Sequence, residues 1–273
     1  MTMHRILVPT DLTPVGAKAV EQAVSIAKKS SESLVLLHVM DEKQSRREDI
    51  EHRLEEEVKK IKSSSGVESE YLIPEGNIFE VIPEVASERK YNLVVIGTHG
   101  IKGMKQLLFG ANILKLVIKT PKPVLVVQEE TVCCDHFNKL VLPVSSHSSF
   151  KAQVDVALYF SGLYDTEIHL YSIHKPGFEW PQQMMKNIEE ATHAFEIKGV
   201  QLKRVKEEQN VYSLGYAKQT LNYAASVKAN LISMMSIPSK EYYYFAQSDK
   251  ESLLLNDQHI PVLCAGGMIQ PEY

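Results

Sequence analysis

Three glycines, Gly97, Gly100 and Gly110, follow a short apolar run and stand just before a segment with the pattern of a helix. The apolar run, Leu-Val-Val-Ile at 93–96, is typical of a buried strand. A strand that leads through a glycine loop into a helix start presents backbone N–H groups to an anion. Because glycine has no Cβ, its backbone can adopt a positive φ and approach the anion closely. The spacing therefore predicts a phosphate-binding loop.

Groups at two other strand ends are expected beside this loop. Pro9, Thr10 and Asp11 close the first apolar run of the chain, and Val39 closes the second. In an open parallel sheet, ligands bind beyond the carboxyl ends of the strands, at the point where the strand order reverses. We therefore expect these residues and the glycine loop to gather at one edge of a sheet.

Short runs rich in Val, Ile and Leu alternate with helical patterns along the first half. Strands are expected at 5–9, 34–39, about 67–72, 93–96 and 124–127. The helices between them are expected to begin at Thr13-Pro14, to span the charged segment 44–62, to begin at Asn77, and to follow Gly110 as far as Thr120. Strands that are apolar without alternation predict a parallel sheet covered by helices on both faces.

The second half of the chain repeats the first. Residues 5–10 match 139–144 and residues 37–39 match 171–173 at an offset of 134, whereas 92–95 match 230–233 and 123–126 match 261–264 at an offset of 138. These periods are far longer than those of solenoid repeats, so they indicate a duplicated domain. We expect one domain at 1–130 and a second at 136–273.

Composition limits the partners of the protein. The 273 residues carry a formal net charge of −4 and do not look built to coat a polyanion, so nucleic acid is not expected as a partner. Three cysteines give no disulfide framework. No apolar run reaches membrane-spanning length and no cleavable signal is seen, so we expect no membrane contact and a cytoplasmic location. Scattered histidines such as His38 and His99 favour core or surface roles over a metal site.

The glycine spacing and the aspartate after the first strand together resemble the universal stress protein family. Its nucleotide-binding members carry G-x2-G-x9-G followed by Ser or Thr, and an Asp just after the first strand; Gly97, Gly100, Gly110 and Asp11 fit these positions. The resemblance covers almost the whole chain as two tandem copies. It implies an α/β fold of two tandem doubly wound five-stranded parallel-sheet domains, similar to the adenine nucleotide alpha hydrolases and Rossmann-like.

The resemblance also implies a ligand, ATP or another adenine nucleotide, in the first copy. Asp11 and the backbone at Val39 would hold adenine and ribose, and Gly100, Gly110 and the residues after Gly110 would receive the phosphates. No metal is expected beyond the Mg that accompanies a nucleotide. The expected binding residues are Pro9, Thr10, Asp11, Val39, Ile96, Gly97, His99, Gly100, Gly110, Ala111 and Asn112.

Ala111 departs from the family pattern, because the binding members have a hydroxyl there. Losing one charge-assisted hydrogen bond to phosphate should cost about 1.5–3 kcal/mol. Asn112 could restore part of this loss, or it could be only the N-cap of the following helix. Asp11 could instead bond backbone amides of its own loop. Lys102 and Lys105 could supply charge to the phosphates or could be solvated loop residues.

The second copy lacks this set of residues. Ser145 stands at the position of Asp11, and the loop at 236–240 contains Pro238 in place of glycines. We therefore expect no ATP in the second copy. Trp180 and the aromatic stretch at 241–245 could line a pocket or contact surface, or could fill the space of an absent nucleotide.

Three functions follow from these observations. The first is a stress-response regulatory protein that binds adenine nucleotide in its first domain. The second is an interaction or scaffold protein with a vestigial site. The third is a slow ATPase, although no catalytic motif is found and an enzyme is not expected. Family members commonly pair through the last strand, here 124–127 and 262–265, so one chain resembles a covalent pseudo-dimer, and a further homodimer stays open.

Overall fold

The computed structural model describes residues 4–40, 47–98, 110–133, 135–177, 179–208, 216–237 and 247–266. Strands and helices alternate along the chain in both halves. The elements of the first half are β1 (Arg5–Pro9), α1 (Pro14–Ser30), β2 (Ser33–Leu37), α2 (Arg47–Ser65), β3 (Ser69–Leu72), α3 (Ile78–Ala86), β4 (Tyr91–Thr98), α4 (Gly110–Lys119) and β5 (Val124–Gln128). Those of the second half are β6 (Lys139–Pro143), α5 (Phe150–Tyr164), β7 (Glu167–His174), α6 (Gln182–Ile197), β8 (Leu202–Glu208), α7 (Tyr216–Ser226), β9 (Leu231–Met235), α8 (Gln247–Leu254) and β10 (Val262–Ala265).

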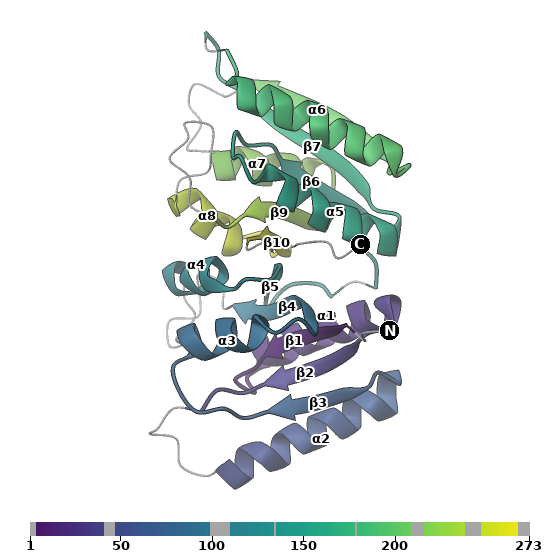
Figure 1. Cartoon of the computed structure of the whole chain (residues 1–273), viewed down its shortest axis with the longest axis vertical. Coiled ribbons are helices and arrows are strands. Elements are labelled where there is room, and N and C mark those ends of the chain that lie inside the picture. Colours follow the sequence, from purple (N-terminus) through teal and green to yellow (C-terminus); the bar gives the residue numbers. More distant parts are fainter. Residues whose placement is uncertain are drawn as a thin grey trace.

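The strands of the described part form one ten-stranded sheet in the order β3-β2-β1-β4-β5-β10-β9-β6-β7-β8 (Figure 1). All neighbouring pairs are parallel except β5 and β10, which run antiparallel with Val126 opposite Val262. The expected α/β fold with parallel strands is therefore confirmed. The two five-stranded sets join edge to edge into a single sheet, and the division into domains at 1–130 and 136–273 stays a prediction.

The two halves have the same strand register. Arg5 of β1 lies opposite Ser33 of β2, and Lys139 of β6 lies opposite Glu167 of β7. The offset of 134 found in the sequence is thus the offset between equivalent positions in space, at least for the first two strands of each half.

Helices cover both faces of the sheet. The apolar residues of α1, α2, α5 and α6 pack in one core cluster, and those of α3, α4, α7 and α8 pack in another on the opposite face. Successive strand residues point to opposite faces, so Ile6 and Val8 enter the first cluster and Leu7 enters the second. Burial on both faces explains why the strands are apolar without alternation.

Local signals set the helix ends. The Thr13 side chain accepts a hydrogen bond from the N–H of Gly16, and Pro14 is the first residue of α1, as the sequence predicts. The Asn77 side chain caps α3 by accepting from the N–H of Phe79 at 2.8 Å. β2, by contrast, ends at Leu37 and not at 39. Among the described helices, none combines the length and the apolar character that a membrane crossing requires.

Hydrogen bonds link the halves beside the joint between β5 and β10. The Gln128 amide donates to the carbonyl of Asn256 at 3.0 Å, and the Thr131 hydroxyl donates to the carbonyl of His259 at 2.9 Å. Both Gln128 and Thr131 are buried. Since a buried polar group that loses its partner costs free energy, these bonds fix how the two halves meet.

Candidate functional site

The carboxyl ends of β1, β2 and β4 lie side by side at one edge of the sheet in the first half. The strand order reverses between β1 and β4, because α1 and α2 cover one face while α3 and α4 cover the other. Pro9 ends β1 opposite Leu37, and Val39 lies two residues beyond the end of β2. The structure therefore brings Pro9, Thr10, Asp11 and Val39 to the edge where ligands bind in such sheets.

The loop between β1 and α1 is held by its own side chains. One oxygen of Asp11, Oδ1, accepts from the N–H of Thr13 at 3.1 Å and from the Thr13 hydroxyl at 2.5 Å. The N–H of Leu12 donates to the hydroxyl of Thr10 at 3.1 Å. Asp11 is exposed, and no described residue donates a hydrogen bond to its second oxygen, Oδ2. Asp11 thus bonds its own loop, as one alternative predicted, and still presents a carboxylate oxygen at the edge.

Leu12 adopts an uncommon backbone conformation in this loop. Its φ is 60°, in the left-handed region that non-glycine residues seldom occupy. The guanidinium of Arg53, on α2, donates to the carbonyl of Leu12 at 2.9 Å. Because α2 is formed by residues far along the chain, sequence patterns gave no sign of this contact. Arg53 thus holds the backbone at Leu12, the residue next to Asp11.

His38, the residue that follows β2, supports the same loop. Its Nδ1 lies 2.9 Å from the carbonyl of Thr10, so Nδ1 carries the proton and donates. The ring is buried, and its Nε2 has no hydrogen-bond partner among the described residues. A buried histidine with this geometry is a core residue that positions Thr10, and the expectation of a core role for His38 agrees with it.

Ile96 and Gly97 can contribute only backbone atoms to the edge. The Ile96 side chain is 1% exposed and packs in the cluster under α3 and α4. Gly97 lies in β4 and its φ is not positive, so the left-handed conformation open to glycine is not used at this position. A Cβ at Gly97 would lie 2.5 Å from the carbonyl oxygen of Val15. Glycine is required there because the start of α1 lies directly on the strand.

The glycine loop itself is only partly described. His99, Gly100, Lys102 and Lys105 lie outside the described residues. Gly110 is the first residue of α4 and Ala111 the second, so the N-terminus of this helix follows the loop as predicted. A helix start carries free N–H groups and a partial positive charge, which favour an anion.

Asn112 is not the N-cap of α4. The helix begins two residues earlier, at Gly110, and Asn112 is an exposed residue of its first turn. The alternative that Asn112 only caps the helix was therefore wrong.

At the matching edge of the second half, side chains of the protein bond backbone carbonyls. Asn187, on α6, donates to the carbonyls of Ser145 and His147 at 2.7 and 3.0 Å. The Lys250 ammonium, on α8, donates to the carbonyls of Ser236 and Ile237 at 3.2 and 2.9 Å. Burial lowers the pKa of Lys250 to about 8. Asn187 was missed from the sequence, because nothing local marks a side chain that bonds a loop about forty residues away.

A buried polar network lies apart from this edge, near the start of β7. The His169 ring is 1% exposed; its Nδ1 accepts from the Tyr223 hydroxyl at 2.6 Å, and its Nε2 donates to the Glu167 carboxylate at 3.0 Å. Burial lowers the pKa of His169, which keeps the ring neutral. The network joins α7 to the sheet and has no open position for a ligand.

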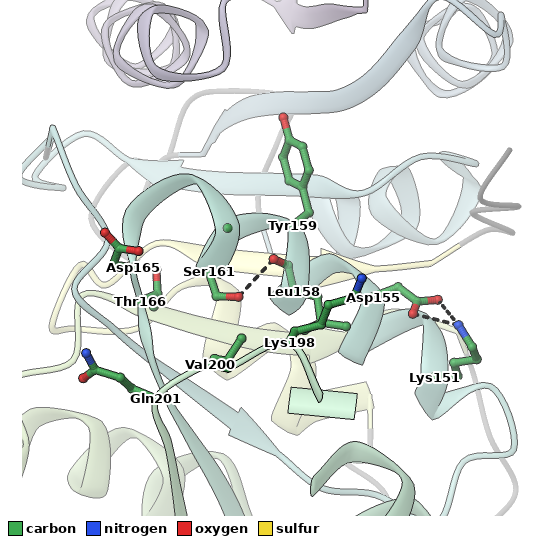
Figure 2. Close-up of a pocket in the computed structure, with 12 residues that line it drawn as sticks. Lys151, Asp155, Leu158, Tyr159, Ser161, Asp165, Thr166, Lys198, Val200 and Gln201 are labelled. Atoms are coloured by element: carbon green, nitrogen blue, oxygen red, sulfur yellow. Dashed lines mark hydrogen bonds and ion pairs between the residues drawn. The ribbon is translucent and has the colours of Figure 1, made fainter. Parts of the chain in front are cut away.

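A groove of about 770 Å³ lies on the opposite edge of the sheet (Figure 2). It is lined by α5 and by the loops that lead into β7 and β8, at the amino ends of these strands. Lys151 and Asp155 pair across 2.7 Å, and the hydroxyls of Ser161 and Thr166 donate to backbone carbonyls of the protein. Because it lies at the amino ends of the strands and contains none of the predicted residues, this groove is not the site that the sequence predicts.

No metal centre is found in the part of the chain that the structure describes. There, no three His, Cys, Asp or Glu side chains gather closely enough to hold a metal ion. A magnesium ion that arrives with a nucleotide would need no such cluster, since phosphate oxygens supply part of its ligand set.

Comparisons with known proteins match part of the chain in sequence. A model of the universal stress protein family matches residues 2–128. One universal stress protein of Methanocaldococcus jannaschii is 30% identical over 139 residues, covering 46% of this chain and 82% of the relative. A second from the same organism is 25% identical over 154 residues, covering 46% of this chain and 95% of the relative.

A solved structure extends the likeness in fold to both halves. The crystal structure of a universal stress protein from Archaeoglobus fulgidus DSM 4304 matches with a TM-score of 0.72 at 16% identity, covering 96% of this chain and 98% of that one. At this identity the match speaks for the fold alone. With the family model on the first half and the relative at 30% identity, the chain belongs to the universal stress protein family.

Proposed function

We propose that this protein is a stress-response regulator that binds ATP or another adenine nucleotide in its first half and none in its second. One observation carries the proposal. The Asp11 loop and the ends of β2 and β4 lie at the point where the strand order reverses, and α4 begins after the loop that follows β4. Such a point combines backbone donors, a helix start and a carboxylate, which together suit a nucleotide.

In this proposal the backbone supplies most of the contacts. Gly100, Gly110 and the first amides of α4 receive the phosphates, with His99 and Asn112 as further donors. Asp11 presents Oδ2 to a ribose hydroxyl. Val39 offers an N–H and a carbonyl that have no partner among the described residues. The loop that carries Asp11 is already held in place, so little ordering entropy would be lost on binding.

Isothermal titration calorimetry with ATP and Mg tests the proposal. Gly100→Val should abolish the heat of ATP binding and leave the unliganded fold intact. Gly162→Val is the matched control, since a Cβ at Gly162 meets no atom within 4 Å and the residue lies far from the edge. No binding by the unmodified protein at millimolar ATP would refute the proposal.

Ala111→Ser tests the role of the missing hydroxyl. The new side chain would offer one charge-assisted hydrogen bond to a phosphate, so ATP should bind about tenfold more tightly. The same calorimetric titration measures this change. Unchanged affinity would mean that the hydroxyl is not what this site lacks.

A ligand-independent scaffold is the second candidate function. It is favoured by Gly97, whose packing against Val15 explains that glycine without a ligand, and by Asp11, whose Oδ1 serves its own loop. We further propose that β5 and β10 make the chain a pseudo-dimer and that two chains pair as a homodimer. Partner binding that is indifferent to ATP would favour the scaffold; phosphate release that falls in Asp11→Ala would favour a slow ATPase.

A further inference from the structure

The carbonyl at the end of β7 is bonded to an indole. Trp180, the single tryptophan of the chain, donates from Nε1 to the carbonyl of Ile173 at 3.2 Å. β7 pairs with β6 in the register with which β2 pairs with β1, so Ile173 corresponds to Val39. The indole therefore lies at the carboxyl edge of the second half, at the position equivalent to the predicted site in the first.

The indole ring is held on several sides. His174 packs edge-on against it with ring centroids 5.5 Å apart, and the Lys206 ammonium lies over it at 4.8 Å from the ring centroid. The ring is half-buried and packs against the core under α5 and α6. Edge-on aromatic and cation–π contacts both favour a flat, electron-rich ring. The end of β7 is thus built around a planar aromatic group that has an N–H donor.

The equivalent position in the first half has no such occupant among the described residues. Neither the N–H nor the carbonyl of Val39 is bonded to any of them. At the other end of the same edge, Lys250 corresponds to Asn112 at the offset of 138, and its ammonium bonds the carbonyls that follow β9. At the end of β7, the second half thus uses its own side chain where no described residue bonds the equivalent carbonyl of the first half.

We propose that Trp180 is a built-in occupant of the second half, a side chain that takes the place of a ligand ring and closes that edge to nucleotide. The inference rests on the proposed function only in naming what the first half binds at the matching position. That the end of β7 accepts a planar N–H-bearing ring follows from the contacts of Trp180. The protein then carries one nucleotide for each chain, and the second half keeps a filled edge with a structural role.

Chemical rescue by indole tests the occupant without any nucleotide. Trp180→Ala should lower the melting temperature and leave a hollow of the shape of the lost ring. Free indole at about ten times its dissociation constant should then raise the melting temperature of the variant by roughly 3 °C and leave the unmodified protein unchanged. Trp180→Phe keeps a ring and should not respond to indole. A Trp180→Ala variant that melts like the unmodified protein, or that ignores indole, would overturn the inference.

Stoichiometry is the second measurement, and it also serves if Trp180→Ala does not fold. Titration with ATP should give one site for each unmodified chain, one for Trp180→Phe and none for Gly100→Val. Two sites in the unmodified protein would mean that the second half is open and would overturn the inference. If no variant binds ATP, the proposed function fails, and the indole response of Trp180→Ala or the lack of it still decides the role of Trp180.

Discussion

Replacing Gly97 by alanine should destabilise the protein although it adds only one methyl group. The new Cβ would lie 2.5 Å from the carbonyl oxygen of Val15, 2.6 Å from its Cγ1 and 3.0 Å from its carbonyl carbon. These distances are far shorter than the roughly 3.5–4.0 Å of favourable contact, and a backbone oxygen can move away only if α1 shifts on the sheet. Overpacking of this kind costs about 1–3 kcal/mol of unfolding free energy.

Urea unfolding followed by circular dichroism measures this cost, and thermal melting should show a fall of roughly 2–12 °C. Gly162→Ala is the matched control: it lies inside α5, where an added Cβ meets no atom within 4 Å, and should gain about 0.5–1 kcal/mol from better helix propensity. If Gly97→Ala unfolds at the same urea concentration as the unmodified protein, the packing explanation of this glycine is refuted.

Three further perturbations test other parts of the structure. Arg53→Ala removes the hydrogen bond to the Leu12 carbonyl, so it should weaken ATP binding two- to tenfold and speed amide hydrogen exchange in the loop at 10–13. Lys60→Ala, on the same helix, should do neither. Equal effects of the two substitutions would contradict the positioning role of Arg53. The free energy of unfolding should fall as the pH drops from about 7 to 5.5, because burial holds the pKa of His169 below 6.5 and the unfolded chain therefore takes up the proton first. His169→Gln should reduce the slope of unfolding free energy against pH by up to about 1.4 kcal/mol per pH unit. An unchanged slope in urea titrations at several pH values would refute this explanation. Asn77→Ala should cost about 1 kcal/mol in thermal or urea unfolding through loss of the α3 cap, and no loss would show that the cap is dispensable.

Much of the fold could be predicted from short-range patterns. The apolar runs gave the strands of the first half to within a few residues, and Thr13 and Asn77 marked two helix starts correctly. These features depend on residues within one turn or one strand, where hydrogen bonding and side-chain period act locally. The duplication was also visible in the sequence, because equivalent strands repeat the same residue types in the same order.

The sequence predicted where several candidate site residues lie in the sheet, but not the contacts that they make. Asp11 and Val39 do lie at the edge, since parallel strands of one sheet end together. Ile96 turned out to be a core residue, and Asn112 proved to lie inside the first turn of α4. Which face a strand residue meets, and where a helix begins after a long loop, depend on packing against segments far away in the chain.

The sequence by itself determined that this is an α/β protein of two repeated halves with a glycine-spaced segment in the first, because periodicity, caps and repeats are properties of neighbouring residues. That the halves pair through β5 and β10 was expected from the family resemblance alone, and the strand pairing shows it. Only the tertiary structure decided that Gly97 makes room for α1 and that Trp180 bonds the carbonyl of Ile173. Each of these depends on contacts between residues distant in the chain, and such contacts form only when the whole sheet has assembled.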